Sequence, residues 1–310
     1  MIDRAVRDAA RRREGLAEGA YRLAHEGELP ARATVDVYAG FAVLAVPEDA
    51  PTGVVDEISL ELTKLDVRGV YLKRRPRVAS RASANLAALA PPGPIHGEHA
   101  PDPLVIEERG ARYRVRLGAG LSTGLFLDQR ENRARVRALA RGARVLNLFS
   151  YTCSFSVAAA LGGATRVTSV DVSGEALAVG EANFVENGLD PAAHRFKRED
   201  ATVALARAKI RGDRWDIIVL DPPSFASKRG AAHDVARDLA GLLDAARAVL
   251  AERGTVFVST NHRGTSAATL RGIARRAFPD ARLDEPTLPS DFPSAPGEAP
   301  FVKTVVITRR

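Results

Sequence analysis

The sequence VLNLFSYTCSFS, residues 145–156, is the strongest indication of the fold of this chain. It begins with an apolar run, bends through polar residues at 150–154, and continues as an apolar stretch of helical length over 155–161. A strand that ends in a tight bend and leads into a helix is the first βα unit of a doubly wound fold, where ligands bind outside the carboxyl ends of the strands. The helix N-terminus leaves free N–H groups there for an anion or a polar group.

Strand and helix patterns alternate around this unit. Strand candidates cover residues 144–149, 166–171, 194–197, 215–220, 254–259, 281–285 and 301–308. Helix candidates cover residues 132–140, 155–161, 174–187, 201–210, 234–251 and 266–278. This spacing predicts βαβ crossovers and a mostly parallel sheet. Only a proline-rich segment separates the last two strands, so we expect them to be antiparallel neighbours. The prediction is a Rossmann-like α/β fold of seven strands with the last one antiparallel, similar to class I methyltransferases in fold alone.

The N-terminal part has a different pattern. It predicts helices over 5–20 and 56–65, a hairpin over 34–46, a strand over 69–73, a loop or linker over 79–103 and a second hairpin over 104–107 and 112–117. We therefore expect a small α/β domain over residues 1–118, without a recognisable catalytic constellation, and a Rossmann-like domain over residues 119–310.

Composition restricts the class of protein. The hydrophobic fraction of 45% in 310 residues supports a sizeable core. No run of about 18 apolar residues predicts a membrane span, and the charged N-terminus is unlike a secretory signal. The single cysteine, Cys153, argues against a disulfide or a cysteine-based zinc site. We expect a cytoplasmic protein without a metal ion. The net charge of +7 has two interpretations that charge alone does not separate: GC-rich codons, or a polyanionic partner.

Carboxylates follow two of the expected strands. Asp171 stands where nucleotide-binding sheets place an acid that accepts hydrogen bonds from ribose hydroxyls. The alternative is a helix N-cap, a role that the neighbouring Ser173 fills equally well. Asp200, or the amide of Ala201 after it, can bind an adenine amino group, or Asp200 is only the N-cap of the next helix. Both interpretations of Asp200 stay open.

The stretch IIVLDPPSF, residues 217–225, is the most specific. Asp221 ends a buried strand, and Pro222 and Pro223 then fix φ and withhold two N–H donors, which leaves carbonyls free to accept from a substrate amino or amide group. Phe225 can stack on a planar base, or it is a buried residue of a proline-rich turn. Asn261 adds an amide at the same edge after the next strand.

Five segments, taken together and in order, resemble the S-adenosylmethionine-dependent 23S rRNA methyltransferases, the bacterial large-subunit enzymes I and K/L and their relatives. They are GLFLDQR at 124–130, LFSYT at 148–152, VD at 170–171, DPPSF at 221–225 and STN at 259–261. The resemblance covers about residues 104–310 and extends weakly over 20–75, where that family has a small α/β domain. No counterpart of the family's PUA domain is visible in the sequence.

The resemblance implies S-adenosylmethionine as cofactor and assigns each site residue a role. It implies that the methionine part is lined by Phe149, Ser150, Tyr151 and Thr152, the ribose by Asp171 with Ser173 beside it, the adenine by Asp200 and Ala201, the sulfonium by Asp221 and Pro222, and the cofactor or incoming base by Gln129 and Arg130. The chain departs from the family at Cys153, where a glycine is usual, and at Asp291-Phe292-Pro293, where an acid followed by His-Pro is common.

The cysteine count bears on the substrate. Methylation of pyrimidine C5 needs a thiolate that adds to the ring, and no cysteine follows the strands that end at Asp221 and Asn261. A nitrogen nucleophile needs only alignment with the methyl group. Resemblance to the K-type enzymes favours guanine N7 of 23S rRNA. The alternatives are another RNA, a protein or a small molecule as substrate, and a non-catalytic RNA-binding relative. A dehydrogenase is disfavoured because G-x-G-x-x-G is missing after the first strand. The oligomeric state stays open.

Overall fold

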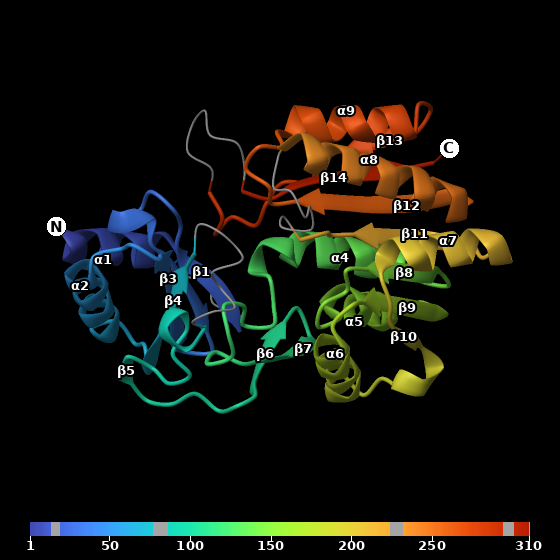
Figure 1. The fold of residues 1–310 in the computed structure, drawn as a ribbon. Coiled ribbons are helices and arrows are strands. Elements are labelled where there is room, and N and C mark those ends of the chain that lie inside the picture. Colours follow the sequence, from blue (N-terminus) through green and yellow to red (C-terminus); the bar gives the residue numbers. More distant parts are fainter. Residues whose placement is uncertain (14–18, 77–85, 224–231, 294–300, 310) are drawn as a thin grey trace. The chain divides into compact units, whose positions relative to one another are not determined.

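The computed structural model describes residues 1–13, 19–76, 86–223, 232–293 and 301–309 (Figure 1). The chain divides into two compact units: residues 1–127 with 290–293, and residues 128–289 with 294–310. The domain division expected from the sequence, between residues 118 and 119, stays a prediction. Each unit is described by itself below.

The second unit is built on a seven-stranded sheet. Its strands are β8 (Arg144–Leu148), β9 (Arg166–Asp171), β10 (Arg195–Arg198), β11 (Trp215–Leu220), β12 (Leu250–Thr260), β13 (Arg282–Asp284) and β14 (Lys303–Thr308). They lie in the order β10-β9-β8-β11-β12-β14-β13. The pairs from β10 to β12 are parallel, and β14 is antiparallel to both of its neighbours. The predicted Rossmann-like sheet with an antiparallel last strand is therefore confirmed.

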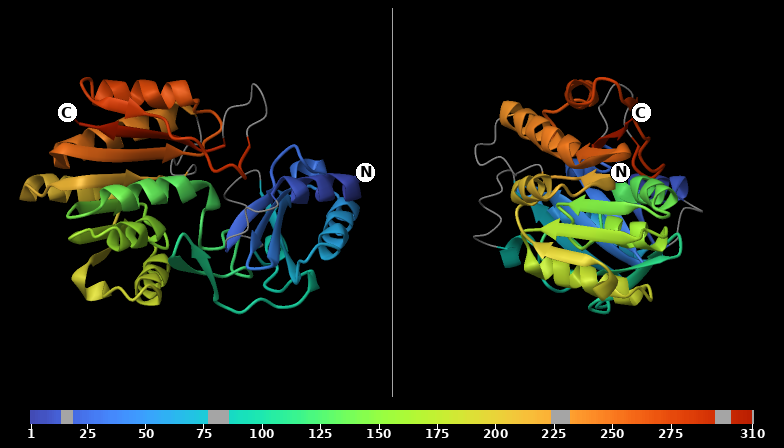
Figure 2. Two further views of the ribbon diagram at one scale, coloured as in Figure 1. Left: turned by 180° about the vertical axis from the view of Figure 1, so that it is seen from behind. Right: turned by 90° about the vertical axis from the view of Figure 1, so that its right-hand side faces the viewer.

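Helices cover both faces of this sheet (Figure 2). One group packs together and consists of α4 (Arg130–Leu139), α5 (Ser154–Leu161) and α6 (Gly174–Glu186). The other consists of α7 (Ala201–Arg211), α8 (Ala232–Val249) and α9 (Ala267–Ala277). Because both faces are covered, the central strand β11 is apolar without alternation, and Ile217 to Leu220 are at most 3% exposed. Every helix expected in this part of the sequence is present, with ends shifted by a few residues.

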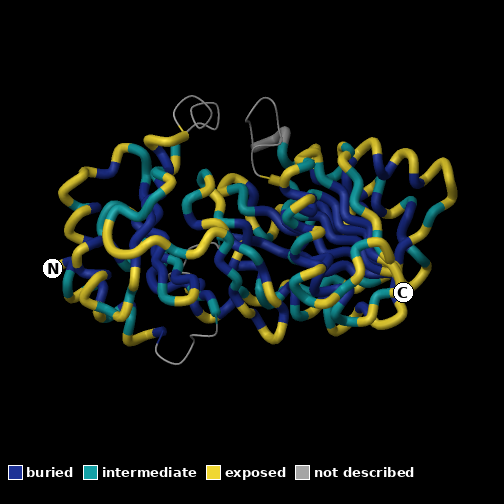
Figure 3. Tube along the Cα trace, turned by 90° about the horizontal axis from the view of Figure 1, so that it is seen from below, coloured by how far each residue is buried: buried dark blue, intermediate teal, exposed yellow. Residues whose placement is uncertain are grey.

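The first unit holds a five-stranded sheet in the order β1-β2-β3-β4-β5. Its strands are β1 (Ala20–Ala24), β2 (Thr34–Tyr38), β3 (Phe41–Pro47), β4 (Gly69–Arg75) and β5 (His96–Gly97), accompanied by α1 (Ile2–Arg12), a 3-10 turn (Pro30–Arg32), α2 (Thr52–Thr63) and α3 (Leu86–Leu89). A separate ribbon pairs β6 (Leu104–Glu108) with β7 (Ala111–Val115). The inner strands β3, β11 and β12 are mostly buried, whereas the edge strands β5, β10 and β13 contain no buried residue; Figure 3 shows burial along the chain.

Both expected hairpins are confirmed. Ala39 and Gly40 have φ of 47° and 83°, and Arg109 and Gly110 have φ of 52° and 73°. Two left-handed residues in a two-residue connection match the right-handed twist of the flanking strands. The sequence patterns around these dipeptides therefore located the turns correctly.

Two expectations for the first unit are wrong. The helix expected over 5–20 ends at Arg12, and β1 begins at Ala20. The stretch AYRLA does not alternate because four of its five residues are buried, and its pairing with β2 makes it a strand. The expected loop over 79–103 contains α3 and β5. None of the helices in the described part of the chain has the length and apolar character required to cross a bilayer.

Candidate functional site

The parallel strands bring four connecting segments to one edge of the sheet. Leu148 of β8 lies opposite Val170 of β9 and Leu220 of β11, and Leu220 also lies opposite Val258 of β12. The segments that follow these strands therefore begin at the same level. The strand order reverses between β8 and β11, and ligands of open α/β sheets bind at this switch point.

The loop after β8 is strained. Phe149, Tyr151 and Cys153 have φ of 57°, 47° and 61°, so three residues in five are left-handed without being glycine. Each such residue costs about 1–3 kcal/mol and persists only where its surroundings fix it. Here the Ser150 amide donates to the Val170 carbonyl at 3.0 Å, and the Cys153 amide donates to the Ser150 carbonyl at 2.7 Å. Strain of this kind is concentrated at binding sites.

Cys153 has a left-handed backbone conformation that glycine adopts without cost. At this position, where the family usually has glycine, the cysteine is therefore conformationally unfavourable. Its side chain is fully buried, and burial raises the pKa of the thiol to about 11. The Sγ atom lies 3.8 Å from Ser150 Oγ and 3.7 Å from the Tyr151 carbonyl oxygen. The thiol is therefore neutral near pH 7 and belongs to the packing of the loop.

Asp171 connects the first two loops of the edge. Its Oδ2 accepts from the Tyr151 amide at 2.8 Å, and its Oδ1 accepts from the Ser173 amide at 2.9 Å. The N-cap of α6 is Ser173, whose Oγ accepts from the Ala176 amide at 3.1 Å. A carboxylate accepts about four hydrogen bonds, so each oxygen of Asp171 keeps capacity for one more donor. The side chain is only partly buried, which leaves that capacity accessible.

Asp200 is an N-cap. Its Oδ1 accepts from the amides of Thr202 at 2.8 Å and Val203 at 3.3 Å, which lie in the first turn of α7. Its pKa is lowered, first by the hydrogen bond from the Thr202 hydroxyl. The capping interpretation is confirmed, and Ala201 after it is buried. Contact of either residue with adenine stays a prediction.

A chain of buried polar groups leads from Asp221 across the sheet. Gln129 Nε2 donates to Asp221 Oδ2 at 3.2 Å, and Gln129 Oε1 accepts from Asn132 Nδ2 at 2.7 Å. Asn132 Nδ2 also donates to Thr304 Oγ1 at 3.0 Å, whose hydroxyl contacts that of Ser259 at 3.0 Å. The sequence placed Gln129 near the site but missed Asn132. The available signal was that Asn132 is a polar residue on the buried side of helix α4, where an amphipathic helix usually has apolar residues.

The pKa of the Asp221 carboxyl group is shifted close to neutral pH. Its pKa is raised to about 7, first by burial and then by the neighbouring Asp128 carboxylate. The hydrogen bond from Gln129 and the charge of Arg133 lower the pKa and offset part of this effect. Both protonation states are therefore populated near pH 7, and the group can donate or accept a hydrogen bond.

The remaining predicted residues lie beside Asp221 or outside the described part. Pro222 is partly exposed and Pro223 is exposed, at the carboxyl end of β11. Phe225 belongs to residues 224–231, which lie outside the described residues. Asn261 follows β12, and within the described structure its buried Oδ1 has no hydrogen-bond partner. A buried amide oxygen in this state is costly unless a ligand supplies a donor.

The sequence also missed two residues of α6 that contact the strained loop. Asn183 is 1% exposed and its Nδ2 donates to the Thr152 carbonyl at 2.9 Å. Gly180 faces Cys153, and a Cβ at Gly180 would lie 2.4 Å from the Cys153 sulfur. No cluster of three or more His, Cys, Asp and Glu side chains among the described residues is arranged to hold a metal ion.

A family model of S-adenosylmethionine-dependent methyltransferases matches residues 95–305. The chain therefore belongs to the S-adenosylmethionine-dependent methyltransferase family, as its sheet and switch-point edge indicate. S-adenosylmethionine is the cofactor of this family.

Among its relatives is YwbD of Bacillus subtilis (strain 168), whose name assigns it to the ribosomal RNA large subunit methyltransferases. It is 34% identical over 302 residues, which are 94% of this chain and 75% of that protein. The large subunit methyltransferase K of Neisseria meningitidis serogroup B is 39% identical over 193 residues, 62% of this chain and 54% of that protein. The crystal structure of SMU.776, a methyltransferase complexed with SAH (S-adenosylhomocysteine), superimposes with a TM-score of 0.87 at 30% identity, over 99% of this chain and 80% of that one. The chain thus spans three quarters of YwbD and about half of the K enzyme.

Proposed function

We propose that this protein methylates a base of 23S rRNA, with guanine N7 as the favoured acceptor atom. The observation that carries the proposal is the sheet edge at the switch point. There a loop with three left-handed residues, the partly exposed Asp171 and Asp221, whose pKa is close to 7, come together. The relatives are named as enzymes that act on large-subunit ribosomal RNA, which supports this class of substrate. An excess of seven positive charges suits a polyanion.

The residues of the edge fit S-adenosylmethionine, which supplies an electrophilic methyl group on a sulfonium sulfur. Asp171 keeps free acceptor capacity for the two ribose hydroxyls, and the Tyr151 and Ser173 amides hold its carboxylate in place. We assign the methionine part to residues 149–152 and the adenine to Asp200 and Ala201. Ser173 supports this site through its amide and its cap of α6.

The target base is assigned to the acceptors at the ends of β11 and β12. Guanine offers N1–H and an exocyclic amine, and Asp221, the carbonyl of Pro222 and the buried Oδ1 of Asn261 are acceptors for such donors. N7 carries a lone pair and no proton, so its methylation needs alignment and no general base. Pro223 stiffens the turn. Stacking by Phe225 remains part of the proposal as a sequence-based role.

One observation favours a second candidate, methylation of an exocyclic amine of the base. That product must lose a proton, and Asp221 has a pKa near 7, as a general base requires. The two candidates differ in the atom that is methylated and share the cofactor site.

The test is methyl transfer from labelled S-adenosylmethionine to 23S rRNA that lacks the modification, followed by nucleoside mass spectrometry. We expect 7-methylguanosine to appear. An N-methylated amino group in the product would favour the second candidate. Label on added protein or small molecules, with none on RNA, would contradict the proposal. Calorimetric titration with S-adenosylhomocysteine tests the cofactor site independently.

A further inference from the structure

We infer that Gly180 and Cys153 form a positioning pair that fixes the cofactor loop through helix α6. This inference rests on the proposed role of residues 149–152 in cofactor binding. Neither residue is expected to touch the cofactor, because Cys153 is fully buried and Gly180 lies on the buried face of α6. Their influence on binding therefore passes through the backbone of the loop.

The first observation is the fit between the two residues. A Cβ built on Gly180 would lie 2.4 Å from the Cys153 sulfur and 2.8 Å from the Cys153 Cβ, distances that real Cβ atoms essentially never show. The third nearest atom, the carbonyl carbon of Thr152, would be 3.5 Å away, an ordinary contact. The side chain of Cys153 therefore leaves no room for a Cβ at position 180, so glycine is needed there. No other neighbour of Gly180 imposes this restriction.

The second observation is that both residues are locally unfavourable. Glycine inside a helix costs about 1 kcal/mol relative to alanine. A non-glycine residue in the left-handed region costs about 1–3 kcal/mol, and Cys153 has φ of 61°. Gly180 and Cys153 are each unfavourable in their own segment, and they contact each other. This indicates that the contact between them is the reason why both residues are present.

The third observation is where α6 holds the loop. Asn183, one turn beyond Gly180, donates to the Thr152 carbonyl at 2.9 Å. The same helix is capped by Ser173, whose amide donates to Asp171. Helix α6 therefore holds the Asp171 carboxylate at its N-terminus and residues 152 and 153 along its side. A shift at position 180 would move the two parts of the proposed cofactor site apart.

The test is a double-mutant cycle on the full chain with Gly180→Ala, Cys153→Gly and the double variant. Each protein is titrated with S-adenosylhomocysteine and melted without ligand. Gly241→Ala is the matched control, because Gly241 is also helical and a Cβ there would meet no atom within 4 Å.

We expect Gly180→Ala to weaken S-adenosylhomocysteine binding by about tenfold or more, since over-packing displaces the loop. In the Cys153→Gly background the same change should alter the affinity by less than about threefold, because the clashing atoms are gone and glycine tolerates the left-handed φ. Gly241→Ala should leave the affinity unchanged. If Gly180→Ala alone does not fold, the double variant should fold and bind.

Equal weakening by Gly180→Ala in both backgrounds would overturn the inference, as would an unchanged affinity in the single variant. A cycle that shows coupling in the melting temperature but none in affinity would also overturn it, because the pair would then be structural only. Failure of the proposed function is recognised separately. In that case the wild-type protein does not bind S-adenosylhomocysteine, or binds it regardless of Asp171→Ala.

Discussion

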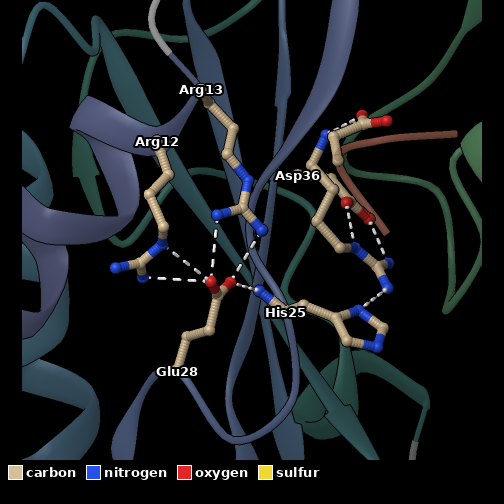
Figure 4. Close-up of polar contacts among 7 residues, drawn as sticks. Arg12, Arg13, His25, Glu28 and Asp36 are labelled. Atoms are coloured by element: carbon tan, nitrogen blue, oxygen red, sulfur yellow. Dashed lines mark hydrogen bonds and ion pairs between the residues drawn. The ribbon is translucent and has the colours of Figure 1, made fainter. Parts of the chain in front are cut away.

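In the first unit, Arg22 and Arg13 are each paired with a carboxylate, whereas the Asp221 carboxyl at the sheet edge of the second unit has another carboxylate as its neighbour. Arg22 Nε and Nη2 contact the two oxygens of Asp36 at 2.7 and 3.0 Å. Arg13 contacts both oxygens of Glu28 at 2.9 and 2.8 Å (Figure 4). Asp221, by contrast, has its pKa raised by burial and by Asp128.

The paired group also anchors a distant segment of chain. The Arg22 amide donates to Asp291 Oδ2 at 2.9 Å, and the Arg22 guanidinium lies 4.3 Å from the centre of the Phe292 ring. Residues 290–293 thereby belong to the first unit, although they follow β13 of the other. His25 Nδ1 lies 3.2 Å from Arg22 Nη1 and must accept, because arginine only donates, so the imidazole is neutral there. Its pKa is lowered, first by burial and then by Arg22.

The difference shows how to distinguish structural from functional polar groups in this chain. In the first unit, Arg22 with Asp36 and Arg13 with Glu28 bring opposite charges together, and the Arg22 group acts as an anchor. At the sheet edge of the second unit, residues with left-handed backbone and a carboxyl group with a pKa near 7 are locally unfavourable. Such features are typical of a binding site. Four substitutions test this difference, in order of decreasing effect.

Breaking the anchor should cost the most stability. Arg22→Met leaves Asp36 buried without its cation, and we expect the free energy of unfolding to fall by about 3–5 kcal/mol. Arg116→Met is the matched control, because its pair with Asp102 is more than half exposed and is worth at most about 1 kcal/mol. Chemical denaturation measures both. Equal losses of unfolding free energy in the two variants would show that the buried pair has no special role. We expect the folded Arg22→Met protein to bind S-adenosylhomocysteine normally.

Removing the carboxylate of Asp171, which we assign to the ribose hydroxyls, should have the largest effect on binding. Asp171→Ala should weaken S-adenosylhomocysteine binding by about 1.5–3 kcal/mol, since charged hydrogen bonds are lost and the Tyr151 amide loses its acceptor. Calorimetry gives the affinity. Asp190→Ala is the control, because that carboxylate caps a short turn before β10. If both variants bind equally well, Asp171 has no place in the cofactor site.

Neutralising Asp221 should stabilise the protein in a pH-dependent way. A folded-state pKa of about 7, against 3.8 for an ordinary aspartate, means that the contribution of Asp221 to wild-type stability is greatest at low pH and falls as the pH rises through this window. Asp221→Asn does not titrate, so its advantage should grow from pH 4 to pH 8. The full shift corresponds to about 4 kcal/mol, and we expect about half because part of the group is accessible.

Thermal melts at several pH values measure this advantage. A stability difference that stays constant with pH would contradict the raised pKa of Asp221. Methyl transfer should fall in the same variant, because the group is assigned to the target base.

The smallest effect separates the two roles of Asp200. Asp200→Ala and Ser266→Ala each remove an N-cap, of α7 and α9, and each should cost about 1 kcal/mol of stability. Only Asp200→Ala should also weaken S-adenosylhomocysteine binding if the carboxylate faces adenine. Identical behaviour of the two variants would leave Asp200 as a cap alone.

The sequence predicted the elements whose signal is local. β11 was placed at its observed bounds because it is apolar on both faces, and the hairpins at Ala39-Gly40 and Arg109-Gly110 were found because their turn chemistry is local. β1 was missed because its strand character comes from pairing with β2. The end of the first helix was misplaced for a related reason, since the charged pattern continues beyond Arg12.

Local sequence patterns were sufficient to predict the alternation of strands and helices and the order of the motifs, because periodicity and turn chemistry act over a few residues. Which side chains meet depends on the tertiary structure. Arg22 and Asp291 are 269 residues apart, Gln129 and Asp221 are 92 apart, and Gly180 accommodates Cys153 across two elements. Such contacts depend on how strands are ordered and helices are packed, so no local pattern records them, and the chemistry of the edge is decided by that packing.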